Sequence, residues 1–160
     1  MELESDNLKS TRSHQIQDAA GEGQLEILQS LLDSSATQIE LDVALEMAIA
    51  YSQLETADYL LSLGADFSNY NYQGVYYAVH NSELEGLKYA IEKGVDINVE
   101  KGMILNKATL AAVYSKQIDI VKWVLDSGAD INLLRTENLE TVNEFGTEEL
   151  RSIINEAPMK

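Results

Sequence analysis

Hydrophobic residues recur at intervals of three and four along this chain, in short segments separated by polar turns. In residues 118–127, Ile118, Val121, Val124 and Leu125 fall on one side of a helix with 3.6 residues per turn. Residues 108–116 ("ATLAAVYSK") precede this segment and predict a first helix of similar length. Such a helix pair cannot bury its apolar stripes alone, so the pattern predicts further pairs stacked beside it.

The end of this unit occurs three times, in "LSLGADFS", "IEKGVDIN" and "VLDSGADIN". The three glycines are Gly64, Gly94 and Gly128, which lie 30 and 34 residues apart. Each has an alanine 16 residues before it, a leucine or isoleucine ten before it, and an acid nine before it. An earlier copy has Ser35 in the glycine position. Glycine readily adopts the left-handed conformation that ends a helix, so each copy predicts the end of a second helix.

This pattern resembles the ankyrin repeat, whose period is about 33 residues. The resemblance is carried by "AAGEGQLEILQSLLDSSA" (19–36) and "AAVYSKQIDIVKWVLDSGADIN" (111–132), covers residues 13–135 and continues more weakly to 155. It implies an all-α helix-turn-helix solenoid with short hairpin-like turns between repeats. The expected units are repeats over residues 13–35, 36–64, 65–94 and 95–128 and a C-terminal capping half-repeat over 129–155, flanked by a flexible N-terminal segment (1–12) and a tail (156–160).

The copies depart from the family in their first helices. None contains the T-P-L-H signature, and the third has Gly74 in the proline position and Tyr76 in the histidine position. In the family, that threonine and histidine tie neighbouring turns together by hydrogen bonds. We therefore expect those bonds to be missing or replaced, and the array to have modest stability.

Charge narrows the classes of partner. The chain has 27 Asp and Glu against 11 Lys and Arg, a net charge of −16, and no cysteine. That field repels phosphate backbones and anionic membranes, whereas a basic protein would be attracted. An alternative interpretation is that the negative charge only keeps the chain soluble and has no role in binding. The hydrophilic N-terminus and the lack of an apolar run of about 18 residues indicate a cytoplasmic protein.

Candidate chemistry is sparse. His14 and His80 are the only histidines, and they lie 66 residues apart. Glu83 and Glu85 form an i,i+2 pair, which faces different sides of a helix. Neither a nucleophile motif nor a metal-ligand spacing occurs. We therefore predict a chain that is not an enzyme and has no catalytic, metal or cofactor site.

The resemblance implies that another protein binds on a concave face formed by turn tips and first-helix ends. This surface would be rich in Tyr and Asn, which suit recognition. The predicted partner-binding residues are Asn69, Tyr70, Asn71, Tyr72, Tyr51, His80, Asn81, Tyr114 and Ser115. We expect Val75 and Tyr77 to be buried in the stack. Tyr59, Tyr89 and Trp123, five residues before the three glycines, should pack between repeats.

The function that best fits these features is a monomeric, non-catalytic module that binds a partner protein, which would be attracted if basic. An inhibitor or immunity-type protein is one version of this hypothesis. Two alternatives are a hydrolase that uses groove carboxylates, which needs convergent acids in a deep pocket, and an acidic nucleic-acid mimic, which needs a regular acidic stripe on one face.

Overall fold

The computed structural model describes the backbone of residues 2–159 and the side chains of residues 11–159. Met1 and Lys160, which belong to the predicted terminal segments, lie outside the described residues. The described backbone is all-helical, as predicted, and contains no strand. Its helices are α1 (Glu2–Gly21), α2 (Leu25–Leu31), α3 (Gln38–Ala50), α4 (Leu54–Ser62), α5 (Gln73–His80), α6 (Leu84–Glu92), α7 (Val99–Ser115), α8 (Asp119–Asp126), the 3-10 helix η1 (Ile131–Leu133), α9 (Thr136–Phe145) and α10 (Glu148–Glu156).

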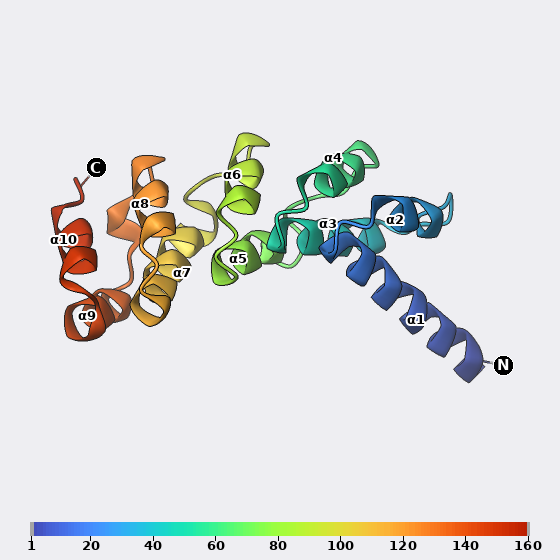
Figure 1. Cartoon of the computed structure of the whole chain (residues 1–160), viewed down its shortest axis with the longest axis horizontal. Coiled ribbons are helices and arrows are strands. Elements are labelled where there is room, and N and C mark those ends of the chain that lie inside the picture. The colour runs from blue at the N-terminus through green and yellow to red at the C-terminus, as the bar shows by residue number, and fades with distance from the viewer. Residues whose placement is uncertain (1, 160) are drawn as a thin grey trace.

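The helices form two rows (Figure 1). The odd-numbered helices lie side by side in one row, where each packs on the next, and the even-numbered helices form the other row. We call the exposed surface of the odd-numbered helices the first-helix face, and that of the even-numbered helices the second-helix face. The core between the rows is apolar and includes the fully buried Ala48, Ala78 and Leu60. This is the predicted repeat stack.

Left-handed residues end the helices where the repeat pattern predicts them. Gly64, Gly94 and Gly128 have φ of 94°, 105° and 100° and follow α4, α6 and α8. Ser35 does not take this conformation, and α2 ends earlier, at Leu31. There the Asp33 carboxylate accepts hydrogen bonds from the backbone N–H and the hydroxyl of Ser35, at 2.9 and 2.6 Å. A side-chain turn therefore replaces the glycine turn in the first repeat.

The turns before α5 and within α7 differ from the predicted hairpin-like turns. Tyr70, Asn71 and Tyr72 all have positive φ, of 45°, 55° and 61°. Thirty residues later, Glu100, Lys101 and Gly102 repeat this conformation, with φ of 49°, 56° and 81°. A left-handed residue other than glycine costs about 1–2 kcal/mol. The third and fourth repeats thus both turn the chain by one tight left-handed turn, at some cost in stability.

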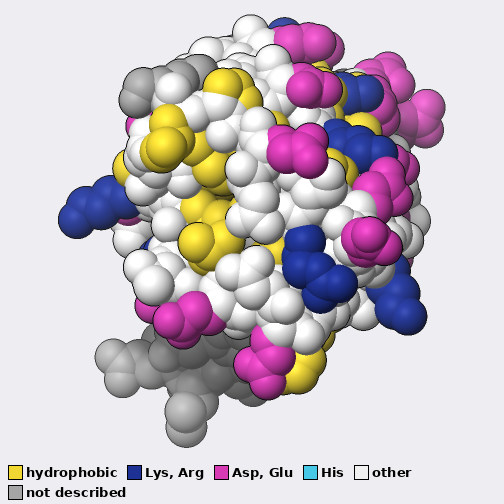
Figure 2. All heavy atoms as spheres, turned by 90° about the vertical axis from the view of Figure 1, so that its left-hand side faces the viewer, with side chains coloured by type: hydrophobic (Ala, Val, Ile, Leu, Met, Phe, Trp, Pro, Cys, Tyr) yellow, Lys and Arg dark blue, Asp and Glu magenta, His cyan; other side chains and the backbone are white. Residues whose placement is uncertain are grey.

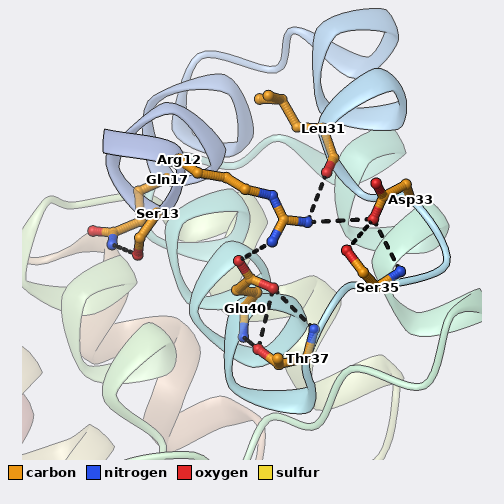
Figure 3. Close-up of polar contacts among 8 residues, drawn as sticks. All are labelled: Arg12, Ser13, Gln17, Leu31, Asp33, Ser35, Thr37 and Glu40. Carbon is orange, nitrogen blue, oxygen red and sulfur yellow. Dashed lines mark hydrogen bonds and ion pairs between the residues drawn. The ribbon is translucent and has the colours of Figure 1, made fainter. Parts of the chain in front are cut away.

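Arg12 ties the first helix pair to the second (Figure 3). Its guanidinium donates to the Leu31 carbonyl at the end of α2, at 3.0 Å, and to Oε1 of Glu40 in α3, at 2.7 Å. The other oxygen of Glu40 accepts from the backbone N–H of Thr37, which completes the capping box of α3. One side chain therefore stabilises the ends of two helices in different repeats.

The two ends of the stack differ from the sequence expectations. Residues 2–12 are helical where the sequence predicts a flexible segment, and two Glu, two Leu, one Lys and one Arg among these eleven residues favour helix. At the C-terminal end, α9 and α10 make a complete pair instead of a half-repeat. Figure 2 looks onto this end and shows hydrophobic side chains mainly in the left half and centre of the view, with Asp, Glu, Lys and Arg side chains gathered mainly on the right.

Candidate protein-binding surface

Three of the predicted site residues lie at the exposed ends of the first helices. Tyr51 caps α3, His80 ends α5 and Tyr114 lies at the end of α7. The Tyr51 and Tyr114 side chains are 47% and 78% exposed, and His80 is exposed as well. The three residues belong to successive first helices, α3, α5 and α7, which lie side by side in one row (Figure 1).

Helix α5 adds two aromatic rings to this face. Val75, Ala78 and Val79 fill its buried side, which leaves Tyr76, Tyr77 and His80 on the other side. The rings of Tyr76 and His80 are stacked with centroids 6.4 Å apart. Tyr77 stands edge-on to Tyr76, at 5.5 Å, and to His80, at 6.3 Å. The three rings therefore support one another as a rigid aromatic cluster.

Helix α7 contributes a cation to this cluster. The Lys107 ammonium lies over the Tyr76 ring, 4.6 Å from its centroid. Such a contact is worth about 0.5–1 kcal/mol at an exposed site. Lys107 thereby links the third repeat to the fourth across the first-helix face.

The prediction for Val75 is confirmed, whereas that for Tyr77 is wrong. Val75 is 1% exposed, but Tyr77 is 40% exposed. In the register that puts Gly74 in the proline position and Tyr76 in the histidine position, Tyr77 falls on the variable position of T-P-L-H-x-A. Here the buried stripe of α5 is already complete without it, because Val75, Val79 and Ala78 occupy the core side.

The predicted site residues 69–72, in the turn before α5, are of two kinds: some are exposed, and the others make structural contacts. Tyr70 is 62% exposed and Asn71 is also exposed. Asn69 instead donates to Oε1 of Glu46 in α3, at 2.6 Å, and half-buried Tyr72 packs against the core at the start of α5. Burial raises the pKa of Glu46, and the Asn69 bond partly offsets that shift. Asn69 and Tyr72 therefore hold the turn in place.

Asn81 and Ser115 also make structural contacts. Asn81 donates from Nδ2 to the Ala50 carbonyl at the end of α3, at 2.9 Å. The Ser115 hydroxyl donates to the Ala111 carbonyl one turn back in α7, at 2.7 Å. Both residues remain exposed, but their polar atoms serve helix ends.

The exposed rings form a set that we call the aromatic row. Its exposed members are Tyr51, Tyr77, His80, Tyr114 and Phe145, and the half-buried Tyr76 supports Tyr77 and His80 from within it. Tyr76, Tyr77, Phe145 and the neighbouring Lys107 were absent from the sequence-predicted site. Phe145 is 66% exposed at the end of α9. The helical period of residues 73–80 was the available signal for the two tyrosines, and the position just before Gly146 was the signal for Phe145.

The aromatic residues of the second-helix row behave differently. Tyr59 and Trp123 pack against the core and Tyr89 is only 7% exposed, in keeping with the packing role expected of them. The Tyr89 hydroxyl donates to Oδ1 of Asp58 at 2.6 Å, and the Lys93 ammonium lies 5.0 Å from the Tyr89 ring centroid. Burial, followed by the Asp58 bond, raises the pKa of Tyr89.

The described part of the chain holds neither a cluster of metal-binding side chains nor a membrane-spanning helix. Between residues 11 and 159, no group of three or more His, Asp or Glu side chains is placed to hold a metal ion. None of the helices between residues 2 and 159 has both the length and the apolar character needed to cross a membrane.

Comparison with known proteins matches the repeat pattern to a protein family. A family model described as ankyrin repeats, in three copies, matches residues 16–101, which is more than half of the chain. No curated protein matches the chain. The matched range runs from α1 to the start of α7 and includes Tyr51, Tyr76, Tyr77 and His80.

Proposed function

The chain belongs to the ankyrin-repeat family, and on that premise we propose that it is a non-catalytic module whose protein partner docks on the aromatic row. Ankyrin repeats are generally protein–protein interaction modules. The single observation that carries the proposal is the exposure of large rings at the ends of α3, α5, α7 and α9.

Exposed rings in this arrangement suit recognition for a physical reason. Tyr offers a large contact area with few rotatable bonds, and its hydroxyl can pair with polar groups of a partner. Tyr76, Tyr77 and His80 already brace one another, so less side-chain freedom would be lost on docking. Interfaces are enriched in such aromatic anchors.

The charge of the chain favours a basic partner. The net charge of −16 attracts a positively charged surface and speeds its association. If the basic partner is an enzyme, docking would block part of its surface, and the chain would act as an inhibitor or immunity-type protein. Association should weaken as salt is raised, because the attraction is screened.

The test compares capture of proteins from a lysate of the source cells by three immobilised forms of the chain. These are the wild type, a Tyr51→Ala/Tyr77→Ala/Tyr114→Ala variant, and a control with Ile27→Ala and Leu63→Ala. The control removes two large side chains of similar exposure from the second-helix row (51% and 42%).

We expect the wild type and the control to retain the same basic protein, and the triple variant to bind it at least about 30-fold more weakly, as loss of a hot spot of 2 kcal/mol implies. Equal retention by the triple variant, with an unchanged helical signal, would show that the aromatic row is not the binding surface.

A further inference from the structure

A hollow of ≈ 300 Å³ lies beside the aromatic row, between the ends of α1 and α3. It is lined by Asp18 and Gly21 of α1, by Glu22 directly after that helix, by Met47 of α3 and by Tyr51, which caps α3. Gly21 keeps it open: a Cβ atom at this position would lie 3.3 Å from Cδ2 of Tyr51 and 3.5 Å from Cε of Met47. A larger side chain at residue 21 would therefore occupy the hollow.

The two walls of the hollow differ in chemistry. Glu22 follows α1 directly, and its backbone N–H donates to the Asp18 carbonyl at 2.9 Å, so the two residues lie one helical turn apart on the same side of the hollow. Met47 and Tyr51 have the same spacing at the end of α3 and present a thioether and an aromatic ring. An anionic wall thus faces an apolar, aromatic wall.

The anionic wall is not neutralised by the described side chains. None of the ion pairs formed between residues 11 and 159 includes Asp18 or Glu22. Glu22 accepts one hydrogen bond, from the neutral Gln24 amide at 2.6 Å. Both carboxylates also lie near the C-terminal end of α1, where the helix dipole is negative and adds to the attraction for a cation.

We propose that this hollow receives an arginine side chain of the partner. A guanidinium is a planar cation that stacks on aromatic rings and pairs with carboxylates through its fork of N–H donors. Here it would lie against the Tyr51 ring with its donors towards Asp18 and Glu22, and its aliphatic stem would contact Met47. The charge complementarity selects a cationic occupant, and the ring opposite favours arginine over lysine.

This inference rests on the proposed function, because the arginine would belong to the partner that docks on the aromatic row. Tyr51 is part of both the hollow and the row. It specifies what the row alone does not: a partner that carries an arginine at the end of its contact surface nearest α1. The preference for a guanidinium can be tested without the partner.

The experiment records NMR signals of the Met47 methyl group and the Tyr51 ring while N-acetyl-arginine methylamide is added to the full chain. The control ligand is N-acetyl-citrulline methylamide, which has nearly the same shape and no charge. We expect saturable shifts with the arginine compound and at least tenfold weaker binding of the citrulline compound. The methyl signals of Met103 and Met159 serve as internal references.

Three variants separate charge from shape. Asp18→Asn/Glu22→Gln should weaken binding of the arginine compound at least tenfold, and Gly21→Leu should do so by filling the hollow. Glu92→Gln/Asp126→Asn, which removes two exposed charges from α6 and α8, should leave binding nearly unchanged.

Equal shifts with the citrulline compound, or equal binding by the Asp18→Asn/Glu22→Gln variant, would overturn the proposal. Because no partner is present, either result would leave the aromatic row's function standing. Conversely, if the triple tyrosine variant captured the partner as well as the wild type does, the arginine compound could still bind in the hollow.

Discussion

Tyrosines occur on both faces of this repeat stack, yet their surroundings are opposite. On the second-helix row, Tyr89 is 7% exposed and its hydroxyl is bonded to Asp58. On the first-helix face, Tyr77 is 40% exposed and stands edge-on to two neighbouring rings of the same helix. Burial and hydrogen-bonding partners, and not residue type, therefore decide whether a tyrosine ring stabilises the stack or stays exposed on its surface.

The largest expected contrast is in stability. Tyr89→Ala should lower the free energy of unfolding by about 3–4 kcal/mol, because removing a buried aromatic ring leaves a cavity. Tyr77→Ala should change it by less than about 1 kcal/mol, because its ring is partly exposed. Urea unfolding followed by circular dichroism measures both. Similar losses for the two variants would break the distinction between the faces.

A smaller effect should appear at alkaline pH. Burial and the Asp58 carboxylate raise the pKa of Tyr89 above its ordinary value of 10.0, so the folded state holds this proton more tightly than the unfolded state. The stability that the phenol contributes is therefore complete below pH 10.0 and is lost as the pH rises towards the folded pKa.

Tyr89→Phe isolates this contribution. At pH 7 the variant should be less stable by about 1 kcal/mol, the usual worth of one hydrogen bond. Between pH 10 and 11 the advantage of the wild type over the variant should shrink. Urea midpoints of both proteins at pH 8 and pH 11 provide the measurement. An advantage that stays constant over this range would mean that Tyr89 does not titrate as its surroundings imply.

The sequence was sufficient for the repeat stack because its signals are local. The apolar stripes have the helical period, and Gly64, Gly94 and Gly128 end their helices as the spacing predicted. The same pattern misled at Ser35. A serine cannot take the left-handed conformation as easily as glycine, so α2 ends at Leu31 and an Asp33 turn follows.

The candidate site was only partly predictable. First-helix ends followed from the repeat register, which found Tyr51, His80 and Tyr114. The exposure of Tyr77 was not predicted: we expected this residue to be buried in the stack, whereas Val75, Ala78 and Val79 already fill the buried side of α5. The Arg12 bridge joins residues 28 positions apart, and the Lys107 contact joins two helices. Neither leaves a local pattern in the sequence.

We expect a partner to cover the first-helix face and to leave the second-helix face free. Tyrosine-selective nitration, read by mass spectrometry with and without the captured partner, tests this most directly. In the free chain, Tyr51, Tyr77 and Tyr114 should react readily and Tyr89 slowly, in line with their exposure. In the complex, Tyr51, Tyr77 and Tyr114 should be protected while Tyr89 is unchanged. Undiminished nitration of these three tyrosines in the complex would contradict the account.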